Sequence, residues 1–151
     1  MKRIILAAAI ICTNAHAADA ILIDTYTRHT SECQQAYSVS CEPWKQPRRV
    51  SWQHDLSESW STDIGTGTNS YGAKSANVGA MWQPLRYGAI KAGLWASIVT
   101  GYDCNQLRTC IVAGGVVSSV VVGRVVIQAL YVPAIGDGTV GVWNLRTGYQ
   151  F

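Results

Sequence analysis

The sequence predicts an all-β fold: an eight-stranded antiparallel transmembrane β-barrel that follows a cleaved signal peptide. The last eleven residues alternate between two kinds of side chain. Trp143, Leu145, Thr147, Tyr149 and Phe151 form one set, and Asn144, Arg146, Gly148 and Gln150 form the other. Successive strand residues point to opposite faces, so the first set can face lipid and the second can face a polar lumen. A strand of roughly 9–11 residues tilted at about 45° is long enough to cross a bilayer.

The N-terminal residues have the pattern of a secretory signal peptide. Lys2 and Arg3 precede an apolar run from Ile4 to Cys12, and Ala15-His16-Ala17 provides a cleavage site with small residues at its first and third positions. We therefore expect residues 1–17 to be removed on export, which places the mature chain in the cell envelope.

Cleavage would leave one β-barrel domain, residues 18–151, because 134 of the 151 residues remain. Twelve Lys and Arg residues become ten against nine Asp and Glu, and a net charge of +1 gives no reason to expect a nucleic-acid partner. Lipid attachment at Cys12 is an alternative, but such a cysteine normally follows a small residue, whereas Cys12 follows Ile11.

Short segments with a period of two fill the mature chain, and none has convincing helical periodicity. The predicted strands are Ala20 to His29, Arg48 to Asp55, Glu58 to Gly67, Ala73 to Trp82, Ala89 to Gly101, Ile111 to Val120, Arg124 to Val132 and Gly141 to Phe151. Their even number suits a closed barrel. In the fourth and fifth segments the even-numbered positions are apolar and are expected to face lipid. The sixth is almost wholly apolar, but its β-branched residues favour a strand over a helix.

Long and short connections alternate along the predicted strands. The longer ones are Thr30 to Pro47, Thr68 to Gly72, Tyr102 to Cys110 and Pro133 to Val140, and short turns such as Gln83 to Gly88 lie between them. Outer-membrane barrels have short periplasmic turns and longer external loops. We therefore expect the longer connections to lie outside a bacterial cell, on a chain located in the outer membrane.

The four cysteines of the mature chain form two close pairs, Cys33 with Cys41 and Cys104 with Cys110. In an oxidising compartment this spacing favours two local disulfides. A metal site is the alternative, but the spacings are not CxxC, and His29 and His54 have no companion ligands at a recognisable distance. We expect no metal and no cofactor.

The C-terminal half resembles the lipid A palmitoyltransferase PagP family of small eight-stranded outer-membrane barrels. The resemblance is best over residues 68–151, and four short motifs carry it: Trp82-Gln83-Pro84-Leu85, Ile98-Val99-Thr100-Gly101, Tyr131-Val132-Pro133 and the terminal Gln150-Phe151. The chain is also similar to hypothetical envelope barrels of phages and prophages. The resemblance implies a monomer that contacts outer-membrane lipid, either phospholipid or lipid A. By similarity to outer-membrane proteins that end in an aromatic residue, Phe151 is expected to engage the barrel-assembly machinery.

The resemblance also implies a catalytic site. The family's histidine, near the outer end of the first strand, corresponds to His29, and its Asp-Ser pair corresponds to Asn69-Ser70. His29 would act as the base and Ser70 as the nucleophile or oxyanion partner. Asn69 departs from the family, because an amide can orient a histidine but carries no charge. The family's amphipathic helix before the first strand and the Pro-rich break in its sixth strand have no counterpart in this sequence.

Other interpretations remain open. His29 could be an ordinary histidine at the barrel rim, and Asn69-Ser70-Tyr71-Gly72 is a good turn sequence in its own right. The sequence is compatible with three functions: an enzyme acting on acyl chains of outer-leaflet lipid, a non-catalytic barrel that presents disulfide-clipped loops to a partner (as in phage-encoded exclusion), and a soluble small-ligand barrel. The soluble barrel would need its polar face outside.

The cysteine pairing predicts the outcome of peptide mapping without reduction. Each local bridge closes a short loop and would add on the order of 2–3 kcal/mol to stability. We expect peptides linked from Cys33 to Cys41 and from Cys104 to Cys110 in protein isolated from the envelope. Links between the two pairs, or free thiols, would contradict this pairing.

Overall fold

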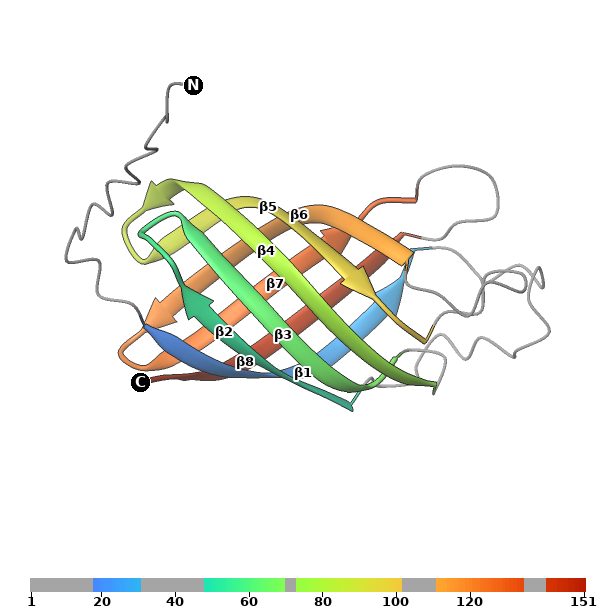
Figure 1. The fold of residues 1–151 in the computed structure, drawn as a ribbon. Helices are drawn as coiled ribbons and strands as arrows, with labels where there is room; N and C mark the ends of the chain where they lie inside the picture. The colour runs from blue at the N-terminus through green and yellow to red at the C-terminus, as the bar shows by residue number, and fades with distance from the viewer. Residues whose placement is uncertain (1–17, 31–47, 70–72, 102–110, 135–140) are drawn as a thin grey trace, which may run out of the picture.

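The computed structural model describes residues 18–30, 48–69, 73–101, 111–134 and 141–151, which form a closed antiparallel barrel (Figure 1). Its strands are β1 (Asp19–His29), β2 (Arg48–Asp55), β3 (Trp60–Thr68), β4 (Lys74–Tyr87), β5 (Ile90–Val99), β6 (Ile111–Val122), β7 (Val125–Val132) and β8 (Val142–Gln150). Each strand pairs with the next along the chain, and β8 pairs with β1. The predicted fold class and all eight strands are confirmed. Among the described residues, no helix is long and apolar enough to cross a bilayer.

The outer face of the barrel is apolar and the inner face is mostly polar. On β8, Trp143 and Tyr149 are 48% and 50% exposed, whereas Arg146 is 2% exposed. The outward side chains on the other strands include Ile21, Ile23, Val50, Trp52, Ile64, Val78, Leu94, Ile98, Val116 and Ile127. A continuous apolar surface of this kind is not stable in water. The barrel is therefore a transmembrane one, and the soluble alternative, which needs the opposite arrangement, is wrong.

Two tight hairpins join strands at one end of the barrel. Gly88 has φ 59° between β4 and β5, and Gly123 has φ 62° between β6 and β7. Each glycine begins a two-residue loop, because Tyr87 pairs with Ile90 and Val122 with Val125. Such loops need a positive φ, which glycine adopts without steric cost.

The turn predicted from Gln83 to Gly88 is wrong in its extent, because β4 continues to Tyr87. The register of β4 against β5 shifts between Trp82 and Leu85, which places Pro84 in a β-bulge. Proline has no N–H to give to the ladder, and a bulge is one of the few places in a sheet where this loss is tolerated.

A second bulge lies in the middle of β1. The register of β1 against β8 shifts between Asp24 and Tyr26, so Thr25 is an extra residue, and its hydroxyl donates to the Leu145 carbonyl at 3.0 Å. Before the bulge Asp24 faces inward. After it the inward positions change from even to odd, so that Thr27 and His29 face the lumen. Unbroken alternation would have directed His29 towards lipid.

The two ends of the barrel differ in their connections. At the turn end lie the hairpins at Gly88 and Gly123, the start of β1 and the C-terminus, where Asp19 and Phe151 exchange backbone hydrogen bonds (Figure 1). The longer connections all leave the opposite end, here called the loop end. This alternation was predicted. The predicted signal peptide, residues 1–17, and the four cysteines of the mature chain lie outside the described residues.

Closure predicts how the protein behaves in detergent. Every strand of the barrel is hydrogen-bonded to two neighbours, so the sheet has no free edge at which sodium dodecyl sulfate could begin to separate strands. The unheated barrel should therefore stay folded in this detergent. We expect the mature protein in the outer-membrane fraction and a shift in its gel mobility after boiling. Recovery of the protein in the soluble periplasmic fraction without detergent would contradict this expectation.

Candidate functional site

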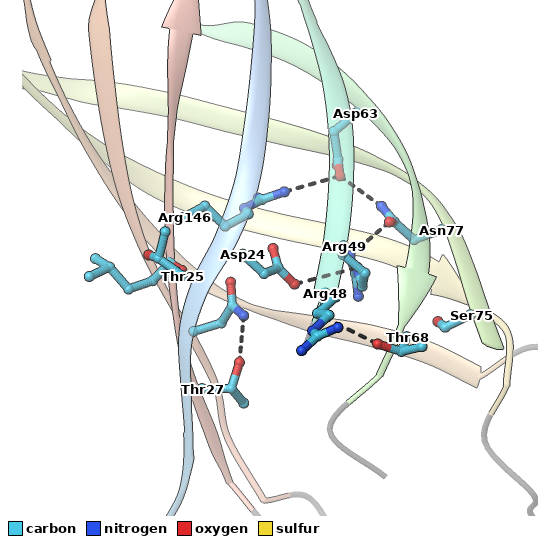
Figure 2. A network of polar contacts seen from close by, with 12 residues as sticks. Asp24, Thr25, Thr27, Arg48, Arg49, Asp63, Thr68, Ser75, Asn77 and Arg146 are labelled. Carbon is cyan, nitrogen blue, oxygen red and sulfur yellow. Dashed lines mark hydrogen bonds and ion pairs between the residues drawn. The ribbon is translucent and has the colours of Figure 1, made fainter. Parts of the chain in front are cut away.

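The centre of the lumen holds a buried carboxylate with three polar partners. Asp63, in the middle of β3, is 1% exposed. It accepts a hydrogen bond from Asn77 Nδ2 at 2.7 Å and one from Trp95 Nε1 at 3.2 Å, and Arg146 Nη1 lies 3.3 Å from its Oδ2. These partners come from β4, β5 and β8, so the contacts connect strands on different sides of the barrel. Figure 2 shows the contacts of Asp63 with Asn77 and Arg146. A buried charge is tolerated only when it is paired and hydrogen-bonded in this way.

A second ion pair continues this network towards the loop end (Figure 2). Arg49 Nη2 donates to Asn77 Oδ1 at 2.7 Å, and Arg49 Nε lies 3.5 Å from Asp24 Oδ2. Asn77 therefore bridges the two ion pairs by donating to Asp63 and accepting from Arg49. With two arginines and two aspartates, the central network has no net charge.

Small residues make room for these large side chains. Gly79 is the cross-strand neighbour of Asp63, and a Cβ atom there would lie 2.7 Å from Asp63 Oδ1. Arg146 Nε and Nη2 and Asp24 Oδ1 have no hydrogen-bond partner among the described residues. Buried polar groups of this kind are usually satisfied by internal water, so the centre of the lumen suits polar occupants rather than hydrocarbon.

Further side chains pack inside the lumen next to the charged layer. Towards the turn end, Gln128 Nε2 donates to Gln53 Oε1 at 2.6 Å, and Gln83 Nε2 donates to Ser119 Oγ at 2.9 Å. Two apolar clusters complete the packing, one of Met81, Trp95, Val117 and Leu130 and the other of Ala20, Leu22 and Val126. An eight-stranded barrel has an interior just wide enough for its own side chains to fill, and this barrel uses its interior in that way.

The structure places His29 and Asn69 at the loop end of the lumen. His29 is 8% exposed at the end of β1, where the bulge turns it inward. Asn69, just beyond β3, is 2% exposed. Its Oδ1 accepts from the Ala73 N–H at 3.0 Å, and its Nδ2 donates to the Gly101 carbonyl at 2.8 Å. Asn69 therefore links the residue before β4 to the segment just after β5, which is a structural use of its amide.

The other predicted site residues lie outside the described part of the chain. These are Ser70 and the cysteines Cys33, Cys41, Cys104 and Cys110. The proposed contact between His29 and Ser70 and the two disulfides therefore stay predictions. Within the described residues, no three His, Cys, Asp or Glu side chains gather as a metal site would require.

The sequence argument assigned Arg146 to the lumen but missed its partners. Asp24 and Asp63 are ionisable residues in the middle of strands that cross a membrane, and Arg49 is an inward-facing ionisable residue near the start of another. Charges at such positions are costly and usually face a protein interior, so this rule could have identified them. The rule could not have said which acid pairs with which base, because that depends on strands far apart in the sequence.

Comparisons with known proteins agree with this architecture. No protein-family model and no curated protein sequence matches the chain. A de novo designed transmembrane β-barrel has a TM-score of 0.60 at 12% identity, over 92% of this chain and 98% of the designed one. Ail, the attachment invasion locus protein of Yersinia pestis, has a TM-score of 0.50 at 16% identity, over 89% of this chain and 99% of Ail.

These likenesses show a shared transmembrane barrel fold. The Ail structures were determined in a phospholipid bilayer nanodisc and in complex with the heparin analogue sucrose octasulfate. At such low identity they do not bear on the predicted membership of the palmitoyltransferase family, which stays a prediction.

The central network predicts a large difference between two acidic residues. Asp63→Ala would leave the Arg146 guanidinium buried without its carboxylate, which typically costs 3–5 kcal/mol, roughly the effect of removing one partner from a buried pair. Glu58→Ala is the matched control, because Glu58 is 82% exposed in its pair with Arg86, and such pairs contribute about 0–1 kcal/mol.

The measurement is the free energy of unfolding in urea. The folded fraction at each urea concentration is read from gel mobility without heating. Asp63→Ala combined with Arg146→Leu should lose less stability than the sum of the single changes, because the two side chains interact directly. Equal effects of Asp63→Ala and Glu58→Ala would contradict the importance of the buried pair.

Proposed function

We propose that this protein is a bacterial outer-membrane barrel that acts as a non-catalytic scaffold and presents its external loops to a partner at the cell surface. The observation that carries the proposal is the filled lumen, in which Asp63 and Arg146 form a buried pair whose side chains are 0% and 2% exposed. A lumen occupied in this way supports the wall of the barrel. The longer connections, which all leave one end, are then the part of the chain left to meet a partner.

An acyltransferase of the resembling family would make a different demand on the lumen. An acyl chain needs an apolar channel, whereas the middle of this lumen holds two arginines and two aspartates. Displacing these groups by hydrocarbon would bury unpaired charge, at a cost of several kcal/mol or more. Asn69 adds to this argument, because its amide is already used in hydrogen bonds to Ala73 and Gly101.

Location and partner follow from the same argument. The apolar belt, the short turns at one end and the longer connections at the other are typical of barrels in the bacterial outer membrane. We propose a monomer that reaches this membrane through the assembly machinery by means of Phe151. Ail, which has the same fold, carries attachment and invasion in its name and was crystallised with a heparin analogue. A surface partner that contacts the loops is the corresponding proposal for this chain.

Acyl transfer is the second candidate, and one observation favours it. The bulge at Thr25 turns His29 into the lumen at the loop end, where Asn69 also lies. In this alternative His29 is the base, Ser70 the nucleophile or oxyanion partner, and outer-leaflet phospholipid or lipid A the substrate. Asn69→Asp would then raise activity by placing a carboxylate beside the imidazole.

Mass spectrometry of lipid A distinguishes the two candidates. Lipid A would be extracted from cells that produce the wild-type chain, His29→Ala or no barrel. For a non-catalytic scaffold we expect three identical profiles, because no acyl chain is added or removed. A lipid A species that is present with the wild type and lost with His29→Ala would contradict the scaffold and support catalysis.

The same cells can be used to test loop presentation. Replacing residues 31–47 by a flexible Gly/Ser linker of equal length should leave heat-dependent gel mobility unchanged but reduce adsorption of a surface ligand or phage that the wild type affects. A matched linker in place of the Gly123-Arg124 turn lies at the opposite end and should leave adsorption unchanged. The comparison uses a ligand or phage whose adsorption the wild type alters. If adsorption to cells with the loop-replaced chain equals adsorption to cells with the wild type, presentation by this loop is contradicted.

A further inference from the structure

The outward face of the loop end is divided into two chemically different sectors. On β7, β8 and β1 aromatic residues predominate: Tyr131 and Trp143, whose ring centroids lie 4.6 Å apart, and Tyr26, which is 36% exposed. Arg28, the cross-strand neighbour of Trp143, is also exposed there. On β2, β3 and β4 the outward face carries Arg48, Thr68 and Lys74 instead. Aromatic residues are the usual occupants of this level in membrane barrels, so the second sector departs from the common pattern.

Strand register places these three residues in one row. Arg48 pairs with Thr68, and Thr68 pairs with Lys74, so all three side chains leave the same face of the sheet. The two cationic residues are exposed and two strand spacings apart, about 10 Å between their Cα atoms. Because both side chains are long and flexible, their charged groups can converge above Thr68. We call these three residues the basic row.

The apolar belt begins directly below the basic row. Two positions further along each strand lie Val50, Thr66 and Ala76, followed by Trp52, Ile64 and Val78. Val50, Ile64 and Val78 are each at least half exposed on the outer face. The basic row therefore lies at the boundary between the hydrocarbon and the polar headgroups, where a lipid headgroup meets the wall of the barrel from the side.

The charges at the two ends are paired differently. At the turn end, Arg86 pairs with Glu58 at 3.3 Å, Lys91 with Asp55 at 4.0 Å and His54 with Asp19 at 2.7 Å. Among the described residues at the loop end, none on the outward face is acidic, and neither Arg48 nor Lys74 has a carboxylate within ion-pair distance. Arg86 and Lys91 at the turn end thus have carboxylate partners within the chain, whereas Arg124 donates to the Tyr149 hydroxyl at 3.0 Å. The two cations of the basic row have no carboxylate partner among the described residues and are accessible to an external anion.

The hydroxyl of Thr68 adds a third donor. Its Oγ1 accepts the Arg48 backbone N–H at 3.2 Å, which leaves its own proton available to a ligand oxygen. A guanidinium, an ammonium and a hydroxyl on one row match the oxygens of a phosphate group. We propose that the basic row binds the phosphate of an anionic lipid in the outer leaflet, with the lipid's acyl chains lying against the apolar belt below. This site does not depend on the proposed function, because either a scaffold or an enzyme could carry it.

Native mass spectrometry of the intact barrel in detergent tests the proposal. The probe is bis-phosphorylated lipid A, and the comparison ligand is the same lipid without its phosphates. Each basic residue near a charged membrane surface contributes enough to change binding about fivefold. We therefore expect about fivefold weaker binding for Arg48→Gln or Lys74→Gln and about 25-fold for both together, with little binding of the phosphate-free lipid.

The control is Arg86→Gln, an exposed arginine at the turn end that is already paired with Glu58. It removes the same net charge and should leave lipid binding unchanged. A shift in gel mobility on boiling that equals the shift of the wild type would show that each variant folds. Equal binding by the double variant and the wild type, an equal loss in Arg86→Gln, or equal binding of phosphate-free lipid would each overturn the proposal. Displacement by equimolar inorganic phosphate would overturn the choice of lipid as the ligand.

Discussion

Pairing of the first strand with the last is the constraint on which the rest of this structure depends. In hydrocarbon no water is present to satisfy a backbone N–H or C=O group, so a sheet can cross a membrane only if its two edges meet. Here β1 and β8 meet over most of their length, and Asp19 and Phe151 complete the ladder with hydrogen bonds of 3.3 and 2.8 Å. In the closed barrel the outward side chains contact lipid and the inward side chains contact each other. Outward positions must therefore be apolar, and inward positions must be able to pack against or bond to one another.

The inward side chains of this barrel are held together by charged and polar contacts as well as by apolar packing. Asp63 receives contacts from Asn77, Trp95 and Arg146, which belong to three other strands. Polar contacts need defined distances and directions, so they hold the wall in one cross-section more specifically than apolar packing would. The filled lumen therefore favours a rigid support for external loops over a container for a long ligand.

Much of the fold could be predicted because its main determinant is local. Alternation along a strand needs only the residues of that strand, as in the closing segment from Val142 to Gln150. Most of the strands followed from it, and the almost wholly apolar sixth followed from its β-branched residues. The two bulges could not be predicted in this way. Thr25 and Pro84 each occupy an extra position that is defined only by the register of a neighbouring strand.

The candidate site was less predictable, since its contacts are not local. Asp63 and Arg146 are 83 positions apart in the sequence, and only closure of the barrel brings them together across the lumen. Asn69 lies at the loop end, and the resemblance gave it a role beside a histidine. The structure shows its amide bonded to Ala73, just before β4, and to Gly101, just after β5. This use depends on which strand ends lie side by side in the closed barrel.

The extra residue in β1 also bears on how related chains should be compared. Before Thr25 the even-numbered residues of β1 face the lumen, and after it the odd-numbered residues do. Leu22 and Thr27 therefore share the inner face although they are five positions apart. An ungapped alignment to a barrel with a regular first strand would match inward residues to outward ones on one side of the bulge. Evolutionary comparison of this segment therefore requires a one-residue gap at Thr25, and without that gap a lumen histidine would be scored as a lipid-facing one.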